Sequence, residues 1–184
     1  NNATPENNYS GGPSLDEPTF TDLGPRSAGT SGDGYIWKYL YTIKPSEAIK
    51  FESTNYIPVP KNWETSTDNA SIRNNAATSG QIKIVTIRNR GVGLGTASRT
   101  YTGVPIKGDG SGAEVTIAIN NDSKVESVTV SKGGSNYTYG TIDLVAGGVP
   151  TGTTSPIFNV IIPPQGGHGA DIYRELGAYS VLVY

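Results

Sequence analysis

The feature that most constrains the fold is an imperfect internal repeat rich in glycine and β-branched residues. Residues 82–91, Ile-Lys-Ile-Val-Thr-Ile-Arg-Asn-Arg-Gly, align with residues 125–134, Val-Glu-Ser-Val-Thr-Val-Ser-Lys-Gly-Gly. Apolar and polar residues alternate in both copies, which is typical of strands that bury one face. Each copy leads to a Tyr-Thr pair and then to another isoleucine strand, at the matched positions Tyr101 and Tyr137, then Ile106 and Ile142.

The residues between the two copies predict a β-hairpin. A glycine-rich turn at residues 108–113 is followed by an alternating strand at residues 114–119 and a polar turn, Asn-Asn-Asp-Ser, at residues 120–123. A strand, a tight turn and a second strand are the signature of an antiparallel pair. We therefore predict a duplicated β module over residues 80–150, built as a small antiparallel sandwich or barrel.

Composition extends this prediction to the whole chain. The 184 residues include 24 glycines and 12 prolines, and only 16 % are charged, which favours short strands joined by tight turns over long helices. Residues 1–33 are mostly Asn, Gly, Pro, Ser and Thr without a period, so we predict an extended arm or linker there. The predicted fold class is mainly β, with antiparallel sandwich- or barrel-like modules, short helical turns and an extended N-terminal arm.

An aromatic segment precedes the repeat. Residues 35–43, Tyr-Ile-Trp-Lys-Tyr-Leu-Tyr-Thr-Ile, predict a strand, residues 45–51 a short helical turn, and residues 56–60 an extended edge segment limited by two prolines. Large aromatic side chains dominate core and interface burial, so packing is favoured over stacking on a carbohydrate. The predicted core or interface residues are Tyr35, Trp37, Tyr39, Tyr41, Ile57 and Val59.

The C-terminal part predicts two strands around a helical turn. The strands are residues 158–162 and 179–184, and Asp171 is expected to cap a turn that Gly177 ends. The chain has a single histidine, His168, whose spacing from Asp171 and Glu175 could place the three side chains together on a helix. A zinc site needs three or four rigid ligands, and the chain has no cysteine and no second histidine. We therefore expect His168 to bond a neighbouring backbone group and predict no metal site.

No catalytic or cofactor-binding constellation is visible in the sequence. A Gly-x-Ser-x-Gly elbow on a strand-to-helix turn is absent, and the glycine pattern at residues 91–95 lacks the Lys-Ser/Thr of a phosphate-binding loop. The acidic residues are scattered singly beside turns, so paired carboxylates for glycoside cleavage are not indicated. We predict that the chain is not an enzyme and binds no cofactor.

Charge and hydropathy exclude two classes of partner. The formal net charge is −2 and no run of Lys or Arg occurs, so a nucleic-acid partner is not expected. No apolar stretch reaches the roughly 20 residues that span a bilayer, so no membrane partner is expected either. The chain lacks methionine, and we expect it to be processed or to be a piece of a longer polypeptide.

Two segments resemble one family of phage proteins. Residues 32–43, Gly-Asp-Gly-Tyr-Ile-Trp-Lys-Tyr-Leu-Tyr-Thr-Ile, with Asn-Tyr-Ile-Pro-Val-Pro at residues 55–60, resemble the baseplate wedge protein encoded by gene eight of T-even-like contractile-tailed phages. The relatives from cyanophages look closer still, and residues 166–177 are similar to a later part of those versions. On this resemblance, residues 34–63 and 151–184 are the wedge-type core strands and residues 80–150 are an insertion.

The resemblance implies a non-enzymatic protein of the virion, located in the tail baseplate. Its expected partners are other baseplate or tail subunits, and the expected state is a homodimer or higher oligomer. Two alternatives stay open from the residues. One is a tail-fibre or adhesin module that binds host glycans through exposed tyrosines at loop tips, at Tyr101, Tyr137 and Tyr139. The other is a tail-associated glycan hydrolase, which requires a cleft with two convergent carboxylates.

Overall fold

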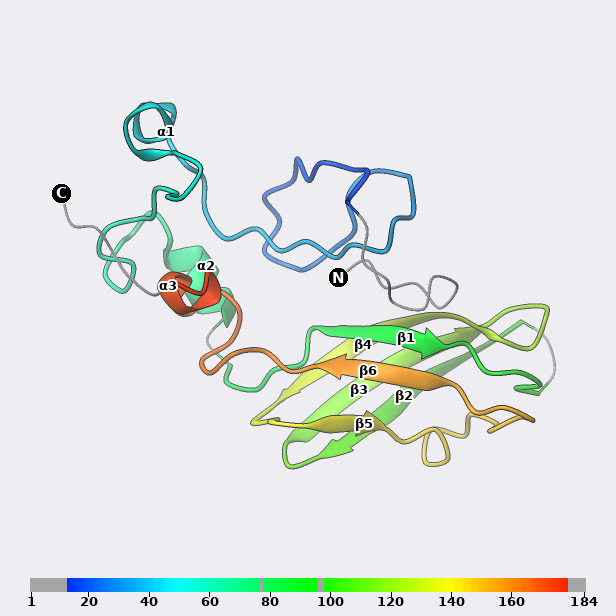
Figure 1. Cartoon of the computed structure of the whole chain (residues 1–184). Coiled ribbons are helices and arrows are strands. Elements are labelled where there is room, and N and C mark those ends of the chain that lie inside the picture. Colours follow the sequence, from blue (N-terminus) through cyan, green and yellow to red (C-terminus); the bar gives the residue numbers. More distant parts are fainter. Residues whose placement is uncertain (1–12, 77, 96–97, 179–184) are drawn as a thin grey trace.

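The computed structural model describes residues 13–76, 78–95 and 98–178. The protein is mainly β, as predicted, with antiparallel sheets, one of them curled into a half-barrel, and a few short helices. Figure 1 shows the strands gathered in one body, with the last two helices beside it and the first helix farther away. The loop that precedes the helices lies above the strands.

Four strands form the larger sheet, in the order β4-β3-β2-β5. They are β2 (Arg99–Gly108), β3 (Ser111–Ile119), β4 (Val125–Ser135) and β5 (Gly140–Ile142), and all neighbours are antiparallel. The predicted hairpin is confirmed, because β3 pairs with β4 through a turn at residues 120–124. Glycine and polar residues supply the tight connections that these short strands need.

A second sheet of two strands completes the β body. It pairs β1 (Ile84–Asn89) with β6 (Ile157–Ile161) in antiparallel register, with Val85 opposite Val160 and Ile87 opposite Phe158. These four side chains are buried or half-buried against the core of the larger sheet. The strand predicted at residues 158–162 is therefore confirmed, and Figure 1 shows β1 and β6 lying across the face of the larger sheet.

The period-two pattern is realised most clearly in β3. Ala113, Val115, Ile117 and Ile119 are buried, and the residues between them are half-buried on the other face. Full burial of a valine or isoleucine side chain contributes about 1.5–3 kcal/mol, so this strand is a major source of the module's stability. Leu94, Val104, Ile106, Val125 and Tyr137 join the same core.

The two copies of the repeat give strands with different surroundings. Ile106 and Ile142, the matched isoleucines, are register partners of β2 and β5. Tyr101 is half-buried beneath the Arg99 guanidinium, 5.2 Å from the ring centre. Tyr137, by contrast, is only 2 % exposed. The repeat is therefore conserved in pattern but not in environment.

The placement of Tyr137 corrects the prediction that it sits exposed at a loop tip. Its hydroxyl donates to the carbonyl oxygen of Ile106 at 3.0 Å, and the backbone N–H of Ala113 donates to the hydroxyl at 3.3 Å. Glycines make room for the ring, because a Cβ at Gly110 would lie 2.5 Å from its carbon atoms. Of the three tyrosines of the adhesin alternative, Tyr137 is buried, Tyr101 is half-buried and Tyr139 is 60 % exposed.

A smaller core lies beside the β body, at the helices. Trp63, Ile72 and Ile172 are buried there, and half-buried aromatic and aliphatic residues pack against them. Ile72 belongs to α2 (Ala70–Ala76) and Ile172 to α3 (Ile172–Glu175). The predicted cap is confirmed, because the Asp171 carboxylate accepts from the backbone N–H groups of Tyr173 and Arg174. The strand predicted at residues 179–184 lies outside the described residues.

The strand predicted at residues 35–43 is wrong as an element. The segment makes a single bridge, in which Arg26 and Trp37 exchange two backbone hydrogen bonds of 3.0 and 2.8 Å. A strand needs a continuous partner edge, and the chain before Trp37 offers only this one point of pairing. Tyr39, Leu40 and Tyr41 instead all pack against the Trp63 core, so successive side chains share one neighbour and the two-fold alternation is lost.

The arm predicted for residues 1–33 carries no helix or strand in its described part. Residues 13–37 fold back into a loop (Figure 1), which two aspartates hold. The Asp33 carboxylate accepts from the Ser14 hydroxyl, at 2.7 Å, and from the Leu15 N–H, at 2.9 Å. The Asp16 carboxylate accepts from the backbone and the hydroxyl of Ser31. Hydrogen bonds to short polar side chains, and not the backbone ladder of a sheet, therefore order this segment.

Asp109 performs a similar role at the end of the β2–β3 hairpin. Its carboxylate accepts from the hydroxyl and the backbone N–H of Thr138 and from the backbone N–H of Tyr139. The Thr138 hydroxyl contributes most, and together these bonds lower the pKa of Asp109 to about 2. The ionised carboxylate therefore fixes the connection between β4 and β5.

This arrangement predicts an acid-sensitive contribution to stability. A lowered pKa means that the contribution is complete above about pH 4 and is lost as the pH falls toward about 2. Asp109→Asn should lower the urea midpoint at neutral pH, and its difference from wild type should shrink across that acidic range. Asp122→Asn, in the exposed β3–β4 turn, should follow wild type throughout. A difference that stays constant from neutral pH to pH 2 would contradict the assignment.

Candidate interaction surface

A rigid helical projection precedes the Trp63 core. Helix α1 (Pro45–Phe51) begins with proline in its first turn, and the Glu47 carboxylate accepts from the Lys44 N–H at 3.4 Å. The helical turn predicted at residues 45–51 is thus confirmed. A tight turn follows, in which the Ser53 N–H donates to the Tyr56 carbonyl at 2.9 Å and the Tyr56 N–H donates to the Ser53 hydroxyl.

The projection exposes large apolar side chains. We call residues 44–57 the exposed knob, because α1 has no buried residue and only Ala48 of these fourteen positions is even half-buried. Ile49 is 87 % exposed, Phe51 41 %, Tyr56 55 % and Ile57 51 %. Figure 1 shows α1 standing away from both the strands and the other helices.

None of the residues of this helix is fully buried. Isolated helices shorter than about 12–15 residues are marginal in water, and most helices in proteins depend on packing of an apolar face. Scattered single exposed apolar residues are ordinary, whereas four within nine positions of one projection mark an interaction site. The geometry of the exposed knob therefore suits contact with another protein.

The exposed knob is held to the rest of the chain at its base. The Tyr41 hydroxyl donates to the Pro58 carbonyl and the Tyr173 hydroxyl donates to the Pro60 carbonyl, each at 2.8 Å. Burial raises the pKa of the Tyr41 hydroxyl, which keeps it a donor at every physiological pH. Prolines lack an N–H but keep their carbonyls, so the segment predicted as an edge is fixed through its acceptors.

Trp63 anchors the segment that follows. Its indole Nε1 donates to the carbonyl oxygens of Gly169, at 3.2 Å, and Ala170, at 3.0 Å. The Trp63 carbonyl accepts from the Arg73 guanidinium at 2.5 Å, and the Tyr41 ring meets the indole edge-on with centroids 6.5 Å apart. A side chain that is 1 % exposed thus ties three distant parts of the sequence together.

The structure separates the six residues predicted as core or interface. Tyr39 and Tyr41 are half-buried against the Trp63 core. Tyr35 and Trp37 are half-buried beside each other, with ring centroids 5.6 Å apart, and the Trp37 Nε1 is buried without a hydrogen-bond partner in the described chain. Ile57 is exposed, and Val59 is half-buried. A role for these residues in an interface stays a prediction.

Sequence reasoning missed Trp63, Ile49 and Phe51. Trp63 stands at the start of a polar stretch without periodic neighbours, so its burial depends on contacts from more than 100 residues away. The only sequence signal for the burial of Trp63 was the residue type, because a tryptophan in a polar turn is stabilised chiefly by burial. Ile49 and Phe51 lie in the predicted helical turn, where apolar residues ordinarily face the core.

The side chain of His168 is hydrogen-bonded to a carboxylate. Its Nδ1 lies 2.6 Å from Glu175 Oε1, so its partner is a side chain and not the backbone group that was expected. Burial acts to raise the pKa of Glu175, but the hydrogen bond and charge of His168 outweigh it, and the pKa lies below its ordinary value. Asp171 is occupied at the start of α3. The described residues contain no group of three His, Cys, Asp or Glu side chains placed to hold a metal ion.

Within the same residues, the helices are too short or too polar to cross a bilayer.

Comparison with known proteins supports one family. The family model described as "Phage-Gp8: Bacteriophage T4, Gp8" matches residues 10–89, which is 80 of the 184 positions. The matched segment contains the arm from residue 10 onward, the aromatic residues, the exposed knob, Trp63 and β1. No curated protein and no solved structure matches the chain.

The match covers less than half of the chain. The T4 protein is a component of the phage baseplate. Strands β2 to β6 and residues 166–177 lie outside the matched segment. Similarity to the cyanophage versions therefore stays a prediction.

Trp63 offers a direct test of how this region is held. Trp63→Ala should lower the free energy of unfolding by about 3–5 kcal/mol, the cost of removing a buried large aromatic side chain. Trp63→Phe should cost less, since a six-membered aromatic ring is kept, although part of the buried volume and the bonds to the two carbonyls are lost. The measurement is urea unfolding followed by far-ultraviolet circular dichroism. Tyr139→Ala, at an exposed aromatic residue, should change the free energy by about 0.5 kcal/mol or less, and an equal loss in Trp63→Ala and Tyr139→Ala would contradict the anchoring role.

Proposed function

We propose that this chain is a structural subunit of a phage tail baseplate, of the wedge type, that acts in assembly through protein–protein contacts. The observation that carries the proposal is the exposed knob, four large apolar side chains on a capped helix and turn. It lies wholly inside the segment that matches the T4 baseplate family. The exposed surface and the family likeness both favour assembly.

The exposed knob has the anatomy of an interface anchor. Aromatic and aliphatic side chains form its apolar part, and Lys44, Glu47, Lys50 and Glu52 surround them with charges of both signs. Apolar groups at the centre with polar groups at the rim are typical of protein interfaces. Because the capped helix and the Ser53 turn are already ordered, little conformational entropy is lost on docking.

The charge order of the knob also favours contact with a second copy. Along the chain the charges alternate as Lys44, Glu47, Lys50 and Glu52. When two copies of α1 run antiparallel, Glu47 can face the second copy's Lys50, because positions 47 and 50 lie three residues apart on one side of the helix. We propose this pairing as the contact of a homodimer.

The rival functions receive less support. An adhesin that uses Tyr101, Tyr137 and Tyr139 as a platform is disfavoured, because Tyr137 is a core residue. A glycan hydrolase needs two convergent carboxylates, whereas the aspartates with lowered pKa, such as Asp109 and Asp143, are engaged in turns and an ion pair. A non-enzymatic protein without cofactor is therefore part of the proposal.

A substitution in the knob should abolish assembly and leave the fold intact. Ile49→Glu places a charge on an 87 % exposed side chain, so circular dichroism and the thermal midpoint should match wild type. In the phage that encodes this chain, the variant should be missing from purified baseplates, as measured by immunoblot and electron microscopy. Val145→Glu, at a 75 % exposed valine outside the matched segment, should be incorporated normally. Normal incorporation of Ile49→Glu would refute the role of the knob.

The homodimer can be tested by exchanging charges. Lys50→Glu should raise the dimer dissociation constant at least tenfold in analytical ultracentrifugation, because two glutamates then face each other. Adding Glu47→Lys to the same chain should restore dimerisation, since opposite charges face each other again. Lys61→Glu, an equal change in charge outside the knob, should have no effect. Failure of the double substitution to rescue, with the helix content unchanged, would overturn the antiparallel pairing.

A further inference from the structure

The Glu175 carboxylate of α3 holds the turn that receives the Trp63 indole. Its Oε1 lies 2.6 Å from His168 Nδ1, and its Oε2 accepts from the Gly169 N–H at 3.4 Å. The carbonyl oxygens of Gly169 and Ala170 in the same turn accept the indole N–H of Trp63. The position of the two indole acceptors therefore depends on the contacts that one carboxylate makes with the turn.

The two side chains of this contact are largely withdrawn from solvent. The side chain of His168 is 23 % exposed and that of Glu175 is 16 % exposed. Partly buried charges are screened by water and salt much less than charges at the surface. A change in the charge of Glu175 therefore acts on the turn more strongly than it would at an exposed site.

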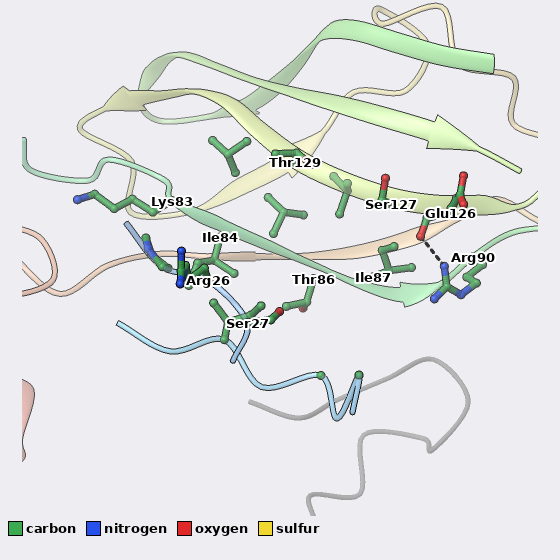
Figure 2. Close-up of a pocket in the computed structure, with 17 residues that line it drawn as sticks. Arg26, Ser27, Lys83, Ile84, Thr86, Ile87, Arg90, Glu126, Ser127 and Thr129 are labelled. Atoms are coloured by element: carbon green, nitrogen blue, oxygen red, sulfur yellow. Dashed lines mark hydrogen bonds between the residues drawn. The ribbon is translucent and has the colours of Figure 1, made fainter. Parts of the chain in front are cut away.

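Lysines from two other segments add positive charge beside this carboxylate. The Lys38 ammonium, from the aromatic segment, donates to the Leu23 carbonyl at 2.8 Å. Burial and then the charge of Lys83 lower the pKa of Lys38, whereas the charge of Glu175 acts to raise it. Figure 2 shows Lys83 beside the start of β1, with its ammonium directed away from the labelled residues of that strand. Glu175 thus balances cations of two elements, His168 and Lys38.

Protonation of Glu175 removes this balance. Burial acts to raise its pKa, but the hydrogen bond and charge of His168, with the Gly169 N–H and the Lys38 charge, hold the pKa below its ordinary value of 4.5. The stabilisation is therefore complete above about pH 4.5 and is lost as the pH falls through the lowered pKa. Imidazole and ammonium groups carry positive charge in acid, so His168 and Lys38 then repel each other across a neutral carboxyl group.

We propose that Glu175 is an acid-sensitive clasp, which holds the turn at residues 168–170 against Trp63 and releases it when the carboxylate is protonated. The released turn carries both indole acceptors away, so the base of the exposed knob loses its anchor. The core of the β body consists of other residues and is kept. The consequence for docking of the knob rests on the proposed function, whereas the clasp itself is measured without a partner.

The experiment uses the full chain with Trp37→Phe, which leaves Trp63 as the single tryptophan. The indole N–H of Trp37 has no hydrogen-bond partner in the described chain, so no printed side-chain bond is lost. Between pH 7 and pH 3 the Trp63 emission should shift to the red, and its quenching by acrylamide should at least double. The methyl resonances of Ile117, which is fully buried in β3, should keep their positions over the same range. An unchanged Trp63 emission, or a loss of the Ile117 resonances with the same midpoint, would overturn the clasp.

Variants of the same chain assign the transition to Glu175. Glu175→Gln should move its midpoint upward by about one pH unit or more, because the cations are then uncompensated at every pH. Glu17→Gln, at an exposed position of the arm, and Asp109→Asn should keep the midpoint of the parent chain. A midpoint that Glu175→Gln leaves in place would refute the assignment. Ile49→Glu should also keep the midpoint, so failure of the clasp is distinguishable from failure of the knob.

Discussion

The hydrogen bonds of the Trp63 indole to Gly169 and Ala170 are the contact on which the arrangement of the chain depends. They join residues separated by 106 and 107 positions in the sequence, one before the β body and one after it. The bond from Tyr173 to Pro60 repeats the connection one turn away. Because a buried indole needs both apolar neighbours and an acceptor, the site accepts few alternatives. The base of the exposed knob is fixed through this contact.

The alternating pattern of the repeat was sufficient to predict the β body. Burial on β3 follows the sequence pattern residue by residue, and the hairpin with β4 was evident from its turn. Tyr137 shows where such reasoning fails. Its position in the pattern matches that of Tyr101, yet glycines remote in sequence create the space that buries it. The alternation of apolar and polar residues predicts a strand, but the environment of a single side chain depends on long-range packing.

The candidate surface was harder to predict for a related reason. An apolar residue in a short helix has the same signature whether it faces a core or a partner, because periodicity reports amphipathicity and not the identity of the covering surface. Ile49 and Phe51 are thus recognisable only once the helix is seen to bury nothing. The aromatic segment was predicted to lie in a core or an interface; its Tyr39 and Tyr41 pack against the Trp63 core, and their hydroxyls bond Thr42 and Pro58.

The contact of Trp63 with Gly169 and Ala170 holds together the segments that precede and follow the β body. The strands between Ile82 and Ile162 leave and return on the same side of the body in Figure 1, next to the helices. A segment with adjacent ends can be lengthened, shortened or exchanged without moving the residues that flank it. Insertions or deletions within the β body therefore need not displace the helical part that carries the knob.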